Sequence, residues 1–128
     1  MKIEVSIGEV FDKVSILEIK REKINDPAKL TYVAGELDII RKTLNDYSVI
    51  IPDLLYNRLK DVNRKLWDTE DIIRKGESTQ NFDEEFIKHA RLDAKLNDER
   101  FLIKNEINNY CNSLIKEQKS YDELYTAD

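Results

Sequence analysis

The sequence predicts an all-α protein in which an antiparallel helical hairpin packs against a second helix pair with a long C-terminal helix, as in a four-helix bundle or coiled coil. There are 3 glycines and 2 prolines in 128 residues, too few for the many turns of a β-sandwich or an α/β fold. Apolar residues recur at steps of three and four along most of the chain. We therefore expect one helical domain over residues 1–128.

The first helix is marked by a start signal. Residues 1–6 alternate apolar and polar side chains, which indicates a short strand or a short extended N-terminal arm. Ser6 precedes Glu9 by three positions, the spacing of a capping box, so the helix should begin near Ile7. Its apolar residues continue at helical spacing to Ile24.

A second helix should begin at Pro27. Asp26 can cap it. Proline suits the first helical position, because an N–H group there would have no partner within the helix. An unbroken three-four stripe of apolar residues follows as far as Leu44. Because the connection is short, we expect the first two helices to form an antiparallel hairpin.

The third helix follows a loop over residues 45–51, whose apolar run should tuck into the core. Pro52 opens this helix, and Gly76 is placed to end it as the C-cap. Residues 77–81 then form a polar turn.

The last helix should run unbroken from Phe82 to about Gln118, because Asn81 and Glu84 have capping spacing and neither glycine nor proline follows. Such a helix would be roughly 55 Å long at about 1.5 Å per residue. A compact domain of this size is narrower, so we expect part of the helix to pack against a second copy in a homodimer. The tail after about residue 121 is expected to be disordered.

Four polar side chains share one stripe of this helix: Asp93, Asn97, Arg100 and Lys104. Apolar residues flank the stripe at the same spacing, which indicates a buried face. The four groups either support an exposed helix as neighbouring charges, or line a binding site, or pair with acids of the first helix such as Asp12 or Glu18. In the last case they would fix the register of two helices.

Two acid pairs have the spacing that places carboxylates on one helix face, as in helical pyrophosphohydrolases that hold magnesium: Glu9 with Asp12, and Asp68 with Asp71. Capping explains Glu9, and basic residues at salt-bridge spacing explain Asp68 and Asp71. The single histidine, His89, and the single cysteine, Cys111, have no partners at the spacing of a zinc or nucleophilic site. We therefore expect no metal and no cofactor, with Asp68 and Asp71 as the remaining metal candidates.

The composition narrows the range of partners. The net charge is −5 and both signs mix along the predicted helices, unlike the concentrated basic surface of a nucleic-acid binder. The N-terminus is too charged for a signal peptide, and no apolar run reaches membrane-spanning length. One cysteine suits a reducing compartment, so we expect a cytoplasmic protein without nucleic-acid or membrane partners.

Three segments together resemble a family of small uncharacterised helical proteins from bacteria and phages, a domain of unknown function: IEVSIGEVFDKVSILEIKREKI, VNRKLWDTEDIIR and LNDERFLIKNEIN. The resemblance spans most of the chain and implies a fold without assigning a catalytic residue. If the three segments converge, they would form one polar binding cluster on the bundle. Its members would be Glu9, Asp12, Lys13, Trp67, Asp71, Asn97, Arg100 and Lys104.

From the sequence we predict a non-enzymatic interaction or assembly module that binds an unknown protein partner through helix faces. Apolar stripes would supply the binding free energy, and the region of Asn97 and Arg100 would fix register and partner choice. The alternative is a helical-bundle enzyme or a binder of an anionic or nucleotide-like compound. Arg100 and Lys104 would then hold the anion, and Asp68, Asp71 or Glu9 would hold magnesium.

Overall fold

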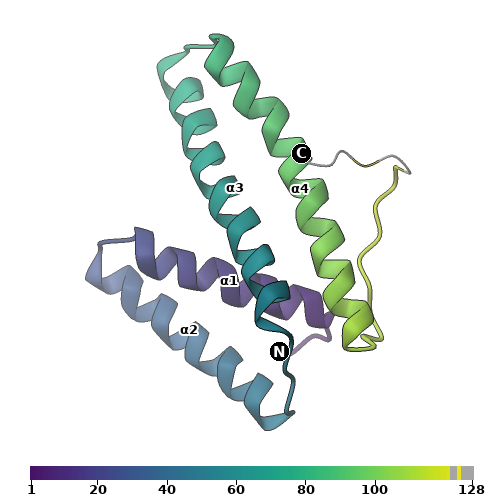
Figure 1. Ribbon diagram of the computed structural model, residues 1–128. Helices are drawn as coiled ribbons and strands as arrows, with labels where there is room; N and C mark the ends of the chain where they lie inside the picture. The colour runs from purple at the N-terminus through teal and green to yellow at the C-terminus, as the bar shows by residue number, and fades with distance from the viewer. Residues whose placement is uncertain (122–123, 125–128) are drawn as a thin grey trace.

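The computed structural model describes residues 1–121 and residue 124, and it confirms the all-α fold (Figure 1). The described helices are α1, Ile7–Lys23; α2, Pro27–Asp46; α3, Asp53–Thr79; and α4, Glu84–Tyr110. In this part of the chain there is no β-strand, so residues 1–6 form an arm without regular structure. None of the described helices has the length and apolar character needed to span a membrane.

The helices form two hairpins, and α1 joins them. Figure 1 shows the α1–α2 hairpin lying across the end of the α3–α4 hairpin that is remote from its connecting loop. Within the described residues, α1 packs against each of the other three helices, whereas α2 packs closely on α1 alone. One apolar cluster fills the space between α1, α3 and α4, and a second joins α1 to α2. The position of α1 therefore determines the shape of the whole molecule.

The helix starts follow the signals in the sequence. Ser6 is the N-cap of α1 and its hydroxyl accepts the N–H of Glu9 at 3.1 Å. Asp26 caps α2, and Pro27 is its first residue. In α4 the cap is Asp83, two residues later than the predicted Asn81, and it accepts the N–H of Phe86 at 3.0 Å.

The predicted end of the third helix at Gly76 is wrong. Helix α3 continues to Thr79 and ends at Gln80, whose φ of 56° is left-handed. Gly76 instead provides room for the ring of Phe86 from α4, because a Cβ there would lie 2.4 Å from Phe86 Cδ2. Gly76 thus permits close packing of α3 against α4 and does not end α3.

The predicted length of the last helix is also wrong. Helix α4 ends at Tyr110, because Asn112 adopts a left-handed φ of 52° and the Ser113 N–H donates to the Asn108 carbonyl at 2.8 Å. The Ser113 hydroxyl also accepts the N–H of Ile7 at 3.1 Å, so the start of α1 holds this end. The following residues turn back beside α4 (Figure 1). Apart from residue 124, the tail predicted to be disordered after residue 121 lies outside the described residues.

Candidate functional site

A cluster of polar side chains lies where α1, α3 and α4 meet. We call it the Asp12 cluster, and its members are Glu9, Asp12, Ser15, Asn63, Arg100, Lys104 and Glu117. Asp12, Ser15, Asn63 and Lys104 are buried. Burial makes every unpaired charge or amide costly, so the partners of each group decide what the cluster can do.

Asp12 is the centre of the cluster. Its carboxylate accepts from Arg100 Nε at 2.9 Å, from Arg100 Nη2, and from Asn63 Nδ2 at 2.8 Å. Asn63 also donates to the Ser15 hydroxyl at 2.7 Å. The two-point contact with Asp12 is the main cause that raises the pKa of Arg100. Arg100 is thus paired with an acid of the first helix, which was one of the three interpretations of the polar stripe.

Lys104 extends the cluster towards the surface. Its Nζ donates to Glu9 Oε2 at 2.7 Å and to Glu117 Oε1 at 2.9 Å, and lies 4.0 Å from Asp12 Oδ2. Burial alone would lower the pKa of Lys104, but the hydrogen bonds that it donates to Glu9 and Glu117 and the charge of Asp12 outweigh burial and raise it. The ammonium group therefore remains charged although it is buried. Glu9 uses its carboxylate here, so only the Ser6 half of the predicted capping box forms.

Helices α1 and α4 approach each other closely at Gly8, and this sets the distances between their side chains in the Asp12 cluster. The Gly8 N–H donates to Asn108 Oδ1 at 2.6 Å. A Cβ on Gly8 would lie 2.5 Å from the Lys104 carbonyl oxygen and 2.9 Å from Asn108 Oδ1. Only glycine therefore lets α1 pack this closely over the turn that carries Lys104.

The Asp12 cluster opens into a polar hollow of about 260 Å³. The hollow is lined by Glu9, Asn97, Arg100, Phe101, Lys104, Glu117 and Lys119. Lys119 Nζ lies 5.5 Å from the centre of the Phe101 ring and 3.5 Å from Glu117 Oε2. Asn97 donates to the backbone and side chain of Asp93, one turn earlier in α4. Three residues of the predicted stripe, Asn97, Arg100 and Lys104, thus face this hollow.

Three other predicted site residues lie elsewhere. Lys13 pairs with Glu36 of α2 at 2.8 Å. Trp67 is half-buried and Asp71 is exposed, and neither has a hydrogen bond or ion pair with the Asp12 cluster in the described structure. The structure thus brings together Glu9, Asp12, Arg100 and Lys104, with Asn97 beside them.

The metal candidates Asp68 and Asp71 are both exposed on α3. Asp68 Oδ1 lies 3.6 Å from Lys23 Nζ, in an ion pair with the end of α1. Within the described part of the chain, no three His, Cys, Asp or Glu side chains are arranged to hold a metal ion. The two carboxylates thus have the surroundings of ordinary surface charges.

His89 and Cys111 take part in packing. His89 Nδ1 lies 3.3 Å from the Thr69 hydroxyl of α3, and its Nε2 lies 3.0 Å from Glu85 Oε1. Cys111 is half-buried against the apolar cluster between α1, α3 and α4, and burial raises the pKa of its thiol. A raised pKa disfavours the reactive thiolate.

Three members of the cluster were not predicted from the sequence: Ser15, Asn63 and Glu117. Asn63 had a detectable signal, because it lies four residues after Leu59 and three before Leu66 on the apolar face of α3. Glu117 had none, because it lies beyond the end of α4 where the chain turns back. The stripe itself also continues one turn further than predicted, to the buried Asn108.

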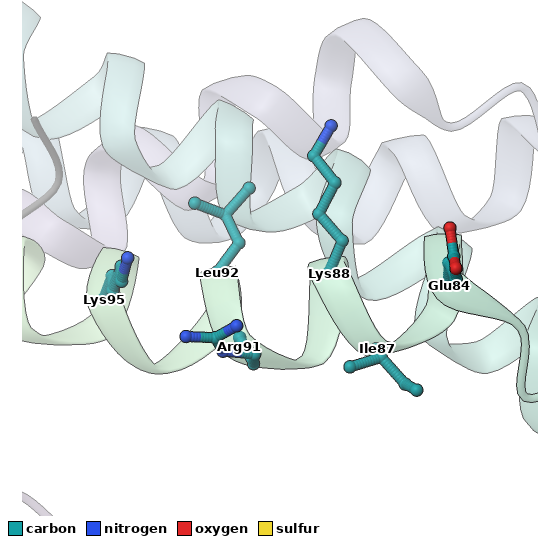
Figure 2. A pocket seen from close by; sticks show the side chains of 6 residues that line it. All are labelled: Glu84, Ile87, Lys88, Arg91, Leu92 and Lys95. Carbon is teal, nitrogen blue, oxygen red and sulfur yellow. The ribbon is translucent and has the colours of Figure 1, made fainter.

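A larger hollow of about 410 Å³ runs along the N-terminal half of α4 (Figure 2). It is lined by Glu84, Ile87, Lys88, Arg91, Leu92 and Lys95, all from this one helix. Figure 2 shows Lys88 and Leu92 projecting from the same side of α4. Because no second element contributes to it, the hollow is a strip of helix surface without converging groups.

An apolar hollow of about 550 Å³ lies at the end of the molecule where the N-terminal arm, the end of α2 and the residues after α4 meet. Among the described residues that line it, Glu4 is the only charged one. A neighbouring hollow of about 270 Å³ shares Leu44 and Val49 with it. Strongly exposed apolar side chains belong to these segments and to the loop after α2, among them Ile3, Tyr47, Ile50 and Leu114. We call the two hollows and these side chains the basal apolar surface.

Comparison with known proteins gives one match. The model of a family described as a family of unknown function (DUF6165) matches residues 1–127. No curated protein and no solved structure matches the chain.

Proposed function

The chain belongs to this family of unknown function, and we propose that it is a non-enzymatic interaction module that assembles through its basal apolar surface. The observation that supports the proposal is the combination of adjoining apolar hollows with exposed Ile3, Tyr47, Ile50 and Leu114. Large exposed apolar patches on folded proteins mark interaction sites. The charged residues among the described lining of the two hollows are Glu4, Arg41 and Asp53, and the predominance of apolar residues in the rest of the lining matches the composition of an interface core.

The partner that fits this surface is a second copy of the chain. A two-fold interface uses the same patch twice, so the patch must contain both a recess and a side chain that can fill it. Leu114 is 98% exposed and stands at the edge of the hollow that it helps to line. In a two-fold pair, Leu114 of each copy would enter the hollow of the other.

In this proposal the polar stripe has a different role from the one predicted from the sequence. Arg100 is engaged with Asp12 inside the chain and does not line the basal apolar surface, so it has no contact with the proposed partner. The Asp12 cluster instead fixes α1 against α3 and α4, and Ser113 ties the end of α4 to the start of α1. These contacts fix the start of α1 and the residues after α4 relative to each other, and Leu44 packs the end of α2 against the same apolar core.

The test is the oligomeric state over a range of protein concentrations, measured by sedimentation equilibrium. The wild-type chain is expected to dimerise, and Leu114→Glu to weaken the dimer at least about tenfold, because each buried leucine contributes about 1.5–3 kcal/mol. The control is Ile39→Glu, which places the same charge on an exposed part of α2 outside this surface. A wild-type monomer at every concentration, or equal dimerisation by both variants, would refute the proposal.

A further inference from the structure

We infer that the polar hollow beside Asp12 is a binding site for a small ligand bearing a carboxylate or phosphate group, and that Glu117 fills it when no ligand is bound. This inference is independent of the proposed assembly, since the hollow and the basal apolar surface share no lining residue. It rests on the charges that line the hollow, on the position of Glu117, and on the kind of segment that carries Glu117.

Three cationic side chains line the hollow: Arg100, Lys104 and Lys119. The Lys104 side chain is only 7% exposed, and its ammonium group reaches the carboxylates at the hollow. A guanidinium group has five N–H donors, and Asp12 uses two of those on Arg100. Converging lysine and arginine donors of this kind are suited to oxyanions.

Glu117 already occupies the place of such an oxyanion. One carboxylate oxygen accepts from Lys104 Nζ at 2.9 Å, and the other lies 3.5 Å from Lys119 Nζ. Burial alone would raise the pKa of Glu117, but the hydrogen bond from Lys104 and the charges of both lysines outweigh burial and lower it. The surroundings of this carboxylate therefore favour a negative charge.

The segment that carries Glu117 permits exchange. Glu9, the other carboxylate on Lys104, is fixed on α1, whereas Glu117 lies in the non-helical residues after α4. This segment has attachments on both sides of Glu117: Lys116 donates to Asn109, and the Tyr121 hydroxyl donates to Asp98. Because neither attachment involves Glu117, its side chain can turn away from Lys104 while the segment and the helices keep their contacts.

The exchange would leave a positively charged hollow of limited size. Without Glu117, three cations face the two remaining carboxylates of Asp12 and Glu9. A volume of about 260 Å³ is below the roughly 300–1,000 Å³ of pockets for drug-sized ligands. A phosphate or carboxylate group on a small molecule fits both the charge and the volume.

The experiment measures binding of sodium phosphate and of sodium acetate by NMR titration at constant ionic strength adjusted with sodium chloride. Glu117→Gln removes the competing charge and is expected to bind one of the two anions at least about tenfold more tightly than the wild-type chain. The control is Glu106→Gln, which makes the same change at an exposed carboxylate paired with Arg58 and should behave as wild type. A second change, Lys119→Ala in the Glu117→Gln chain, should remove the gain, because it deletes a cation that lines the hollow.

The result also identifies the class of ligand. Tighter binding of phosphate supports a phosphorylated ligand, and tighter binding of acetate supports a carboxylate. The inference is overturned if Glu117→Gln binds neither anion better than Glu106→Gln does, or if Lys119→Ala leaves the gain intact.

Discussion

Helix α1 carries two ionic clusters that have similar chemistry but differ in burial. Near its start, Asp12 joins α1 to α3 and α4 through Asn63 and Arg100. Six residues later, Glu18 accepts from Arg41 of α2 at 2.7 Å and from Lys60 of α3 at 2.9 Å. The Asp12 side chain is 2% exposed and that of Glu18 is 15% exposed. Breaking the Asp12 cluster leaves a buried charge that water does not reach. Water can reach the groups of the Glu18 cluster when a partner is removed. The loss of one ion pair should therefore lower the free energy of unfolding more in the first cluster than in the second.

The largest expected effect comes from removing the arginine of each cluster. Arg100→Ala leaves the buried carboxylate of Asp12 with Asn63 as its hydrogen-bond partner and Lys104 Nζ at 4.0 Å, and should lower the free energy of unfolding by about 3–5 kcal/mol. Arg41→Ala removes a side chain that is 44% exposed, and should cost about 1 kcal/mol or less. Urea denaturation of both variants measures the difference. Equal losses would show that burial does not distinguish the two clusters.

A smaller effect is expected at the backbone contact that supports the Asp12 cluster. Gly8→Ala places a methyl group against the Lys104 carbonyl and should destabilise the fold by about 1–3 kcal/mol. The matched control is Gly35→Ala in the middle of α2, where nothing lies within 4 Å of the added carbon. That change should stabilise the protein by about 0.5–1 kcal/mol, because alanine favours a helix interior over glycine. Thermal denaturation followed by circular dichroism shows whether each variant is more or less stable than the wild-type chain. A stabilising Gly8→Ala would contradict the close approach of α1 to α4.

The smallest effect is the pH dependence of the Glu18 cluster. Burial alone would raise the pKa of Glu18, but hydrogen bonds from Tyr56, Lys60 and Arg41 outweigh burial and hold it below 4.5. Stability from Glu18 is therefore fully present above about pH 4.5 and is lost as the pH falls through the lowered value. Between about pH 6 and pH 3, the free energy of unfolding should fall less steeply in Glu18→Gln than in the wild-type chain.

The control for the pH experiment is Asp38→Asn, because Asp38 is exposed on α2 and forms no ion pair with other described residues. Its pH profile should follow that of the wild-type chain. Identical slopes for all three proteins would mean that the contacts of Glu18 do not couple its protonation to folding.

Local signals in the sequence were enough to predict the all-α fold and the α1–α2 hairpin. The contacts that mark the helix starts span few residues: Ser6 caps α1 by accepting the N–H of Glu9, and Asp26 caps α2. The ends were harder to predict. Gly76 is needed by a ring that comes from another helix, and α4 stops where Ser113 meets the start of α1. Both features depend on tertiary neighbours, which residue spacing along one helix does not contain.

The candidate site shows the same division between local and distant information. Helical spacing identified Arg100 and Lys104 as neighbours on one face, and the first helix offered Asp12 or Glu18 as an acid that Arg100 could meet. It could not predict that Lys13 turns to Glu36 on α2, or that Glu117 returns to Lys104 from beyond α4. These positions follow from how the hairpins cross and where the chain reverses.

The separation of Asp12 from Arg100 also affects the order of events during synthesis. The two residues are 88 positions apart, whereas Glu18 meets Arg41 after 23. At about 5–20 residues per second, a ribosome would make Asp12 roughly 4–18 s before Arg100. The α1–α2 pair can form in that interval from nearby contacts, but burying Asp12 without Arg100 would leave its charge uncompensated. We therefore expect the first turns of α1 to stay hydrated in the nascent chain until the last helix has been made.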